Sequence, residues 1–179
     1  MKFFKLPFIL VLAAVALSSC SGDDNGGQQA VEDTGSFSIN DDTFVVPQAF
    51  LIFDGQETQS PYSYRLEFYS DEIVVTGNSI SGTGDFAFIE FDSGVLFGSE
   101  NEVYSFDINS SSGDIIDVYF LTNYNFNIDQ GQFLQAVSGS MQVQRIDDSN
   151  VQVNYTFTGD FGESIEGSYR GSFTRVDDI

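Results

Sequence analysis

Hydrophobic and polar residues alternate along most of the chain from residue 37 onward. Residues 62–69, "YSYRLEFY", follow this pattern, and residues 115–129, "IIDVYFLTNYNFNID", extend it over a longer stretch. Side chains on a strand point alternately to opposite faces, so the pattern predicts strands with one buried and one wet face. In the longer stretch the predicted core face consists of Ile116, Val118, Phe120, Thr122, Tyr124, Phe126 and Ile128.

Further strands are predicted where similar runs lie between turns rich in Gly, Asp, Asn and Ser. They cover residues 44–53, 86–92, 103–108, 137–146, 151–158 and 164–175. No window shows a sustained helical stripe, so we predict an all-β fold, a single antiparallel β-sandwich or meander barrel of roughly 8–10 strands. Periodicity leaves the choice between sandwich and barrel open. Pro47 cannot donate a backbone hydrogen bond, which predicts an edge or a bulge there.

Small and bulky residues alternate on one face of the last predicted strand, as Ile165, Gly167, Tyr169, Gly171 and Phe173. Glycine at such positions lets a strand bend or lets a large neighbour lie across it. This ending resembles the close of small β-rich Bacteroidetes lipoproteins of unassigned function. The resemblance covers about the last quarter of the chain and bears on the fold and the cellular location of the protein.

The first twenty residues have the order of a secretory signal peptide. Lys2 and Lys5 precede an apolar run over residues 6–17, and "LSSC" at residues 17–20 ends in the single cysteine of the chain. The run is shorter than the ~20 residues of a membrane-spanning helix. The "LSSC" stretch resembles a bacterial lipobox, which implies cleavage before Cys20 and acylation of its thiol. An ordinary signal peptide with an incidental cysteine is the alternative.

The residues after Cys20 predict a flexible acidic tether. "SGDD" at residues 21–24 resembles the acidic tract that sends Bacteroidetes lipoproteins to the cell surface, although a solvated linker has the same composition. Residues 20–36 lack apolar periodicity and are rich in Gly, Asp and Gln. We therefore expect a signal peptide at 1–19, a lipid-anchored tether at 20–36 and an all-β domain at 37–179. The implied location is the bacterial outer membrane, at the cell surface or on its periplasmic side.

The charge and the absence of histidine exclude several functions. The chain has 27 acidic residues against 6 basic ones, and the two lysines lie in the predicted signal peptide. Such a surface repels nucleic-acid phosphates. Without histidine, catalytic triads and histidine-based zinc sites cannot form. Carboxylate pairs remain, namely Glu90 with Asp92 and Glu163 with Glu166, but an acidic chain has such pairs by chance, so we predict no enzyme.

One loop offers oxygen ligands for calcium. Residues 107–117, "DINSSSGDIID", lie between two predicted strands, and an EF-hand is excluded because its glycine and its final glutamate are missing. A solvated turn is the alternative, since Asp, Asn and Ser side chains form hydrogen bonds with their own backbone in turns. The candidate ligands are Asp107, Asn109, Ser111, Asp114 and Asp117.

A polar ladder on the wet face of residues 115–129 is the candidate ligand-binding surface. It consists of Tyr119, Asn123, Asn125, Asn127 and Asp129, and later strands add the amides Gln142, Gln144, Gln152 and Asn154. Amides and carboxylates beside an aromatic ring suit a glycan. We therefore expect a non-catalytic module that binds a glycan or a surface protein. A structural lipoprotein of an outer-membrane complex is the alternative, and a carboxylate-pair glycoside hydrolase is a more distant one.

Overall fold

The computed structural model describes residues 32–54, 60–77, 79–110 and 113–177, and the predicted signal peptide and Cys20 lie outside them. The described residues form strands, and the predicted all-β class is confirmed. The strands are β1 (Thr34–Ile39), β2 (Asp42–Val45), β3 (Gln48–Asp54), β4 (Tyr62–Tyr69), β5 (Ile73–Thr76), β6 (Ser79–Ser93), β7 (Glu102–Asp107), β8 (Ile115–Asn125), β9 (Gln130–Arg145), β10 (Val151–Gly159), β11 (Ser164–Gly171) and β12 (Thr174–Asp177).

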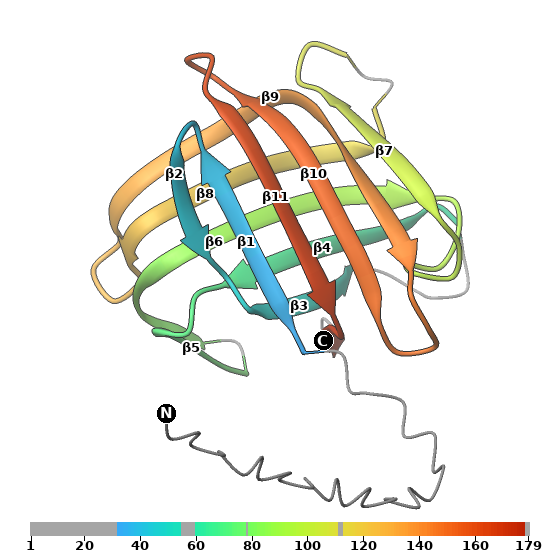
Figure 1. The fold of residues 1–179 in the computed structure, drawn as a ribbon, viewed down its shortest axis with the longest axis horizontal. Helices are drawn as coiled ribbons and strands as arrows, with labels where there is room; N and C mark the ends of the chain where they lie inside the picture. The colour runs from blue at the N-terminus through green and yellow to red at the C-terminus, as the bar shows by residue number, and fades with distance from the viewer. Residues whose placement is uncertain (1–31, 55–59, 78, 111–112, 178–179) are drawn as a thin grey trace, which may run out of the picture.

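The strands form one curled sheet that makes a half-barrel (Figure 1). In the described residues ten strands follow the order β12-β3-β4-β6-β8-β9-β10-β11-β1-β2, while β5 pairs with β6 and β7 pairs with β9. Strands β3, β4, β6 and β8 run across the back of the view, and β10, β11 and β1 cross them steeply in front. The long strand β9 belongs to both layers, so it joins them into a continuous sheet.

The boundary between the predicted tether and the domain lies earlier than residue 37. Strand β1 begins at Thr34, and its first residues pair with β11, where Thr34 lies opposite Arg170 and Ser36 opposite Ser168. These residues carry almost no apolar surface. Backbone pairing with an existing edge, rather than their own side chains, orders them.

Two predicted strands are each divided in the structure. Residues 44–53 split at Pro47, which separates β2 from β3, so that the two parts lie in different layers. The predicted strand 164–175 ends at Gly171, whose φ of 152° admits no ordinary side chain, and the carboxylate of Asp33 occupies the space beside it. Strand β12 then pairs in parallel with β3, which corrects the prediction of a purely antiparallel sheet.

Aromatic and aliphatic side chains from both layers fill the space between them. These side chains include five phenylalanines that are almost completely buried, and packing of their rings stabilises the fold through removal of apolar surface from water. They are Phe37, Phe68, Phe91, Phe120 and Phe157. Gly167 allows this packing, because a Cβ there would lie 2.2 Å from the Tyr155 ring. Of the two roles predicted for the glycines of this strand, the passage of a large neighbour is found at Gly167, whereas the strand ends at Gly171.

Candidate functional site

The outer face of β4, β6, β8 and the first half of β9 carries rings and carboxylates side by side. The pairing register aligns its side chains in three rows that run across the strands. They are Arg65, Glu90 and Asp117; then Glu67, Phe88, Tyr119 and Gln135; then Tyr69, Phe86, Leu121 and Phe133. We call this surface the ring-and-carboxylate face.

Stacked rings connect the buried and exposed parts of this face. The Phe88 and Tyr119 ring centroids are 4.4 Å apart with planes 16° from parallel, and those of Tyr119 and Phe133 are 5.7 Å apart at 29°. Phe88 is 7% exposed, whereas Phe133 is 61% exposed. A large ring that remains in water on a sheet face is available to a ligand.

Hydrogen bonds hold the polar groups of the face in place. The side-chain amide of Gln135 donates to Asp117 Oδ1 at 2.9 Å. The Tyr69 hydroxyl donates to Glu67 Oε2 at 2.7 Å. These bonds fix an amide and two carboxylates in defined positions beside the rings. Vicinal hydroxyl groups of a ligand require such preorganised donors and acceptors.

The phenol of Tyr119 stays protonated at neutral pH. Burial raises its pKa to about 12, and the negative charges of Glu67 and Asp117 act in the same direction while Arg65 opposes them. Burial also raises the pKa of Tyr69, and the neighbouring Glu67 adds to the effect. Both hydroxyls are therefore hydrogen-bond donors over the physiological range.

One end of the face is covered by the chain itself. Tyr69, Ile73, Phe86, Phe88 and Leu121 form a second hydrophobic cluster on the outside of the sheet. Ile73 comes from the short strand β5, and the partly buried rings of Phe50, Tyr119, Tyr124 and Phe126 pack against the cluster. The open part of the face therefore lies toward Phe133 and the row of Arg65, Glu90 and Asp117.

The predicted polar ladder is only partly assembled, because a bulge interrupts β8. Tyr119 lies on the ring-and-carboxylate face, but the β8–β9 pairing shifts register between Thr122 and Asn125, and Asn123 has a φ of 50°. The Asn123 backbone N–H donates to Asp85 Oδ1 at 2.9 Å. Asparagine adopts this left-handed conformation more readily than most residues.

After the bulge the side chains lie on the opposite face of the sheet from the one predicted. Tyr124 and Phe126, which were predicted to face the core, pack against the second cluster on the outside of the sheet. Asn125 and Asp129 instead belong to the β8–β9 hairpin, where Asn125 Oδ1 accepts from the Asn127 N–H at 3.0 Å and Asp129 accepts from the Tyr124 hydroxyl. The prediction of one continuous wet face was wrong.

The prediction of the core face over residues 115–129 was also wrong at both ends of this stretch. Ile116 lies at a second register shift, where Glu90 pairs with Asp117 and Phe91 with Ile115. Ile116 and Ile128 are both exposed large hydrophobic residues. A bulge inserts one extra residue and therefore turns every later side chain to the other face.

The candidate calcium ligands are dispersed. Asp107 Oδ1 accepts from the Asn109 N–H at 2.9 Å, the turn arrangement that was the alternative, and Asp114 accepts from the Ser105 N–H at 3.4 Å. Asp117 lies on the ring-and-carboxylate face, and Ser111 lies outside the described residues. Among the residues that the structure describes, no group of three or more His, Cys, Asp or Glu is placed to hold a metal ion.

The other candidates lie partly on the ring-and-carboxylate face and partly elsewhere on the sheet. The amides form cross-strand pairs on the outer face of β9 and β10, Gln142 with Asn154 and Gln144 with Gln152. Glu90 and Asp92 are on one face of β6 and lie opposite Arg65 and Ser63 of β4. Glu163 accepts from the Phe161 N–H at 3.1 Å in the β10–β11 turn.

Sequence reasoning missed the ring-and-carboxylate face although a signal was present. In residues 86–92, "FAFIEFD", Phe86, Phe88 and Glu90 share one face, and both faces of this strand are aromatic. A strand with rings on both faces buries both or uses one for binding. The partners Gln135 and Phe133 come from a strand more than forty residues later, so only the pairing register could reveal them.

Comparison with protein-family models, with curated proteins and with solved structures finds no match. Within the described part of the chain, no helix has the length and apolar character needed to cross a membrane.

Proposed function

We propose that this protein is a non-catalytic glycan-binding module carried by a bacterial lipoprotein. The observation that carries the proposal is the exposed Phe133 ring beside Tyr119, with the hydrogen-bonded pair of Gln135 and Asp117 on the same face. A pyranose has an apolar face of C–H groups and a rim of hydroxyls. Rings bind the former and fixed amides and carboxylates bind the latter.

The charge of the face favours neutral or amine-bearing glycans. Glu67, Glu90 and Asp117 contribute three carboxylates to the aligned rows, and Arg65 contributes one positive charge. The whole chain carries a formal charge of −21. Uronate-containing or sulfated polysaccharides would be repelled by both the local and the overall charge.

The arrangement supports binding rather than hydrolysis. Glu90 and Asp117 are cross-strand neighbours on an outer sheet face, where both are half-buried. A glycoside hydrolase needs one carboxyl group whose pKa is raised in a cleft that surrounds the scissile bond. The module therefore holds a glycan without cleaving it.

The cellular location proposed for the module rests on residues 17–20. An acylated Cys20 would tether the domain to the outer membrane without a spanning helix. Replacement of Cys20 by Ala is then expected to release the protein from isolated membranes into the soluble fraction. Variant protein that still sediments with the outer membrane would overturn the lipid anchor.

Binding to a panel of neutral, amine-bearing and acidic polysaccharides tests the proposed function. We expect retention by at least one neutral or amine-bearing glycan, and Phe133→Ala is expected to weaken that binding about tenfold, the equivalent of about 1.4 kcal/mol. The matched control is Val103→Ala, which removes an exposed apolar side chain from β7, where the ring-and-carboxylate face does not extend.

Three outcomes would contradict the proposal. They are no binding to any glycan, equal weakening by both substitutions, and binding that is unchanged in Phe133→Ala. Inertness toward glycans together with co-purification of an outer-membrane complex would favour the structural alternative. Release of shorter sugars that stops in Glu90→Gln would show hydrolysis.

A further inference from the structure

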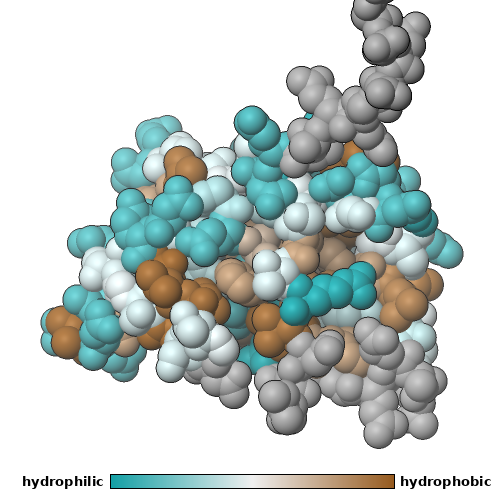
Figure 2. All heavy atoms as spheres, turned by 90° about the horizontal axis from the view of Figure 1, so that it is seen from below, coloured by the Kyte–Doolittle hydropathy of each residue, from teal (hydrophilic) through white to brown (hydrophobic). Residues whose placement is uncertain are grey.

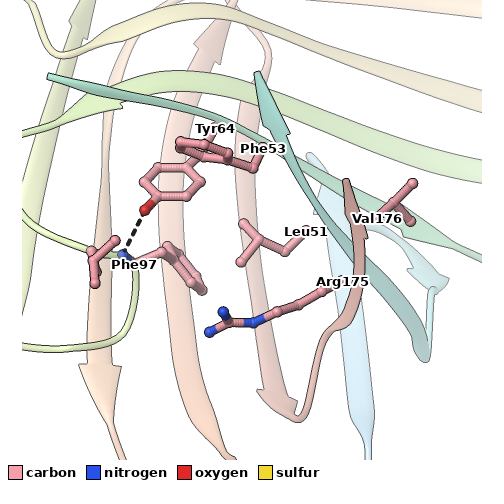
Figure 3. A pocket seen from close by; sticks show the side chains of 7 residues that line it. Leu51, Phe53, Tyr64, Phe97, Arg175 and Val176 are labelled. Atoms are coloured by element: carbon pink, nitrogen blue, oxygen red, sulfur yellow. Dashed lines mark hydrogen bonds between the residues drawn. The ribbon is translucent and has the colours of Figure 1, made fainter. Parts of the chain in front are cut away.

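A small cavity, lined mainly by apolar side chains and by one arginine, opens at the end of the half-barrel where β3 and β12 run side by side. Its volume is about 110 Å³. Figure 3 shows the side chains around it, which come from β3, β4, β12 and the loop between β6 and β7. They are Leu51, Phe53, Tyr64, Leu96, Phe97, Arg175 and Val176.

The aromatic walls of this cavity are held in place by mutual contacts. The Tyr64 centroid lies 5.3 Å from that of Phe53 and 6.0 Å from that of Phe97. The Phe97 backbone N–H donates to the Tyr64 hydroxyl at 3.2 Å, which ties the β6–β7 loop to the sheet (Figure 3). The cavity is therefore preformed, which reduces the entropy lost on binding.

A second, wetter hollow of about 300 Å³ adjoins the cavity and shares Leu51, Phe97 and Arg175 with it. Its outer side is the β9–β10 hairpin over residues 147–151. Figure 2 views the molecule from below, where apolar and hydrophilic side chains meet around a hollow.

The carboxylates of that hairpin already have partners. Asp148 pairs with Arg145. Asp147 accepts from the backbone N–H groups of Ser149 and Asn150 at 2.8 and 2.9 Å, and hydrogen bonding to Ser149 and Asn150 lowers its pKa. Within the part of the chain that the structure describes, the ion pair of this hairpin is therefore made by Arg145 and not by Arg175.

Arg175 extends beneath Leu51 toward Phe97, across the region that the two hollows share (Figure 3). Its guanidinium has no hydrogen-bond or ion-pair partner among the described residues. Arg175 is exposed, and its planar guanidinium can bind a carboxylate that approaches from solvent.

We propose that this cavity binds a small carboxylate ligand that carries one ring-sized apolar group. A closed cavity of about 150 Å³ is known to accept benzene, so a cavity of 110 Å³ that opens to the surface admits at most one ring or a short branched chain. The planar guanidinium of Arg175 matches a carboxylate in a bidentate geometry. A singly charged carboxylate is favoured over a dianionic phosphate, because the acidic surface repels the latter more strongly.

Hydrocinnamate and its neutral amide, hydrocinnamamide, are the probes that test this site in the full chain. Chemical-shift titration measures both affinities. We expect hydrocinnamate to bind with a Kd on the order of 1 mM and at least about tenfold more tightly than the amide, since a charge-assisted hydrogen bond distinguishes them.

Three variants locate the site. Arg175→Gln is expected to remove the preference for the acid, whereas Arg170→Gln, an exposed arginine on β11, is the matched control and keeps it. Leu96→Trp places a bulky ring at the cavity from a residue that is 47% exposed, and it should block both probes without disturbing the core.

Several outcomes would overturn the site: no binding of either probe, equal affinity for acid and amide in the unmodified protein, a preference that survives Arg175→Gln, or unchanged binding in Leu96→Trp. Thermal melting of each variant verifies that it is folded. Because the cavity and the ring-and-carboxylate face share no residues, failure here leaves the glycan proposal standing.

Discussion

The two layers of the half-barrel share one core but have very different outer faces. The outer face of β4, β6 and β8 carries rings and carboxylates around a second hydrophobic cluster. The outer face of β9, β10 and β11 carries hydroxyls and amides, such as Gln142 opposite Asn154 and Asn154 opposite Ser168. The inner faces of both layers are apolar.

This difference distinguishes the outer-face residues that folding requires from those that folding does not require. A sheet with one buried face needs only polar residues on its other face, and the hydroxyl and amide side chains of β10 and β11 meet that need. The rings of Phe86, Phe88 and Phe133 are apolar groups that this requirement does not explain. The second cluster covers the first two, and the exposed Phe133 remains as the feature that points to a ligand.

Removal of a ring from the second cluster should have the largest effect on stability. Phe86 is 3% exposed, and its centroid lies 4.6 Å from that of Tyr69. Phe86→Ala is expected to lower the free energy of unfolding by about 3–5 kcal/mol through lost burial and the cavity left behind. Urea denaturation measures the change.

The control on the other layer is Asn154→Ala, a half-buried outer residue of β10. We expect a change within about 1 kcal/mol there. Equal losses in the two variants would mean that the outer cluster is not a second core, and the contrast between the faces would lose its energetic basis.

The inner side of the hydroxyl layer should be sensitive at Gly167. A methyl group there would overlap the Tyr155 ring, which is closely packed in the core. Gly167→Ala is therefore expected to cost about 1–3 kcal/mol, as overpacking does. Ser168→Ala, the next residue on the exposed side of β11, should be close to neutral in the same denaturation experiment. A neutral Gly167→Ala would show that the ring can move aside.

Alkaline titration should give the smallest and most specific effect. Burial raises the pKa of Tyr119 to about 12, so between about pH 10 and 12 the folded state keeps a proton that the unfolded state has lost. The contribution of Tyr119 to stability is therefore complete below about pH 10 and declines as the pH rises toward 12.

Unfolding monitored by circular dichroism at a series of alkaline pH values measures this decline. Tyr119→Phe should show a shallower loss over this window than the unmodified protein, because Phe carries no titrating proton. An identical pH dependence in both proteins would show that Tyr119 is not buried against Glu67 and Asp117 as described.

Local periodicity predicted most of the strands, but it did not always predict which side chains face the core. Residues 62–69 were predicted as one strand and form β4 without a break. The bulge at Asn123 was not predicted, because an asparagine in the left-handed conformation does not change the alternation of letters. A break in backbone geometry therefore reversed the faces of residues 124–126 without any sign in the pattern.

The amino-acid sequence by itself determined the all-β class and the exclusion of chemistry that needs histidine. These follow from the alternation of side chains along a strand and from residue composition, which need no knowledge of the fold. Only the tertiary structure brought Phe133 and Gln135 beside Tyr119, and Arg175 beside Leu51 and Phe97. Strand pairing decides such neighbours, because it depends on the packing of the whole core and not on any local stretch of the chain.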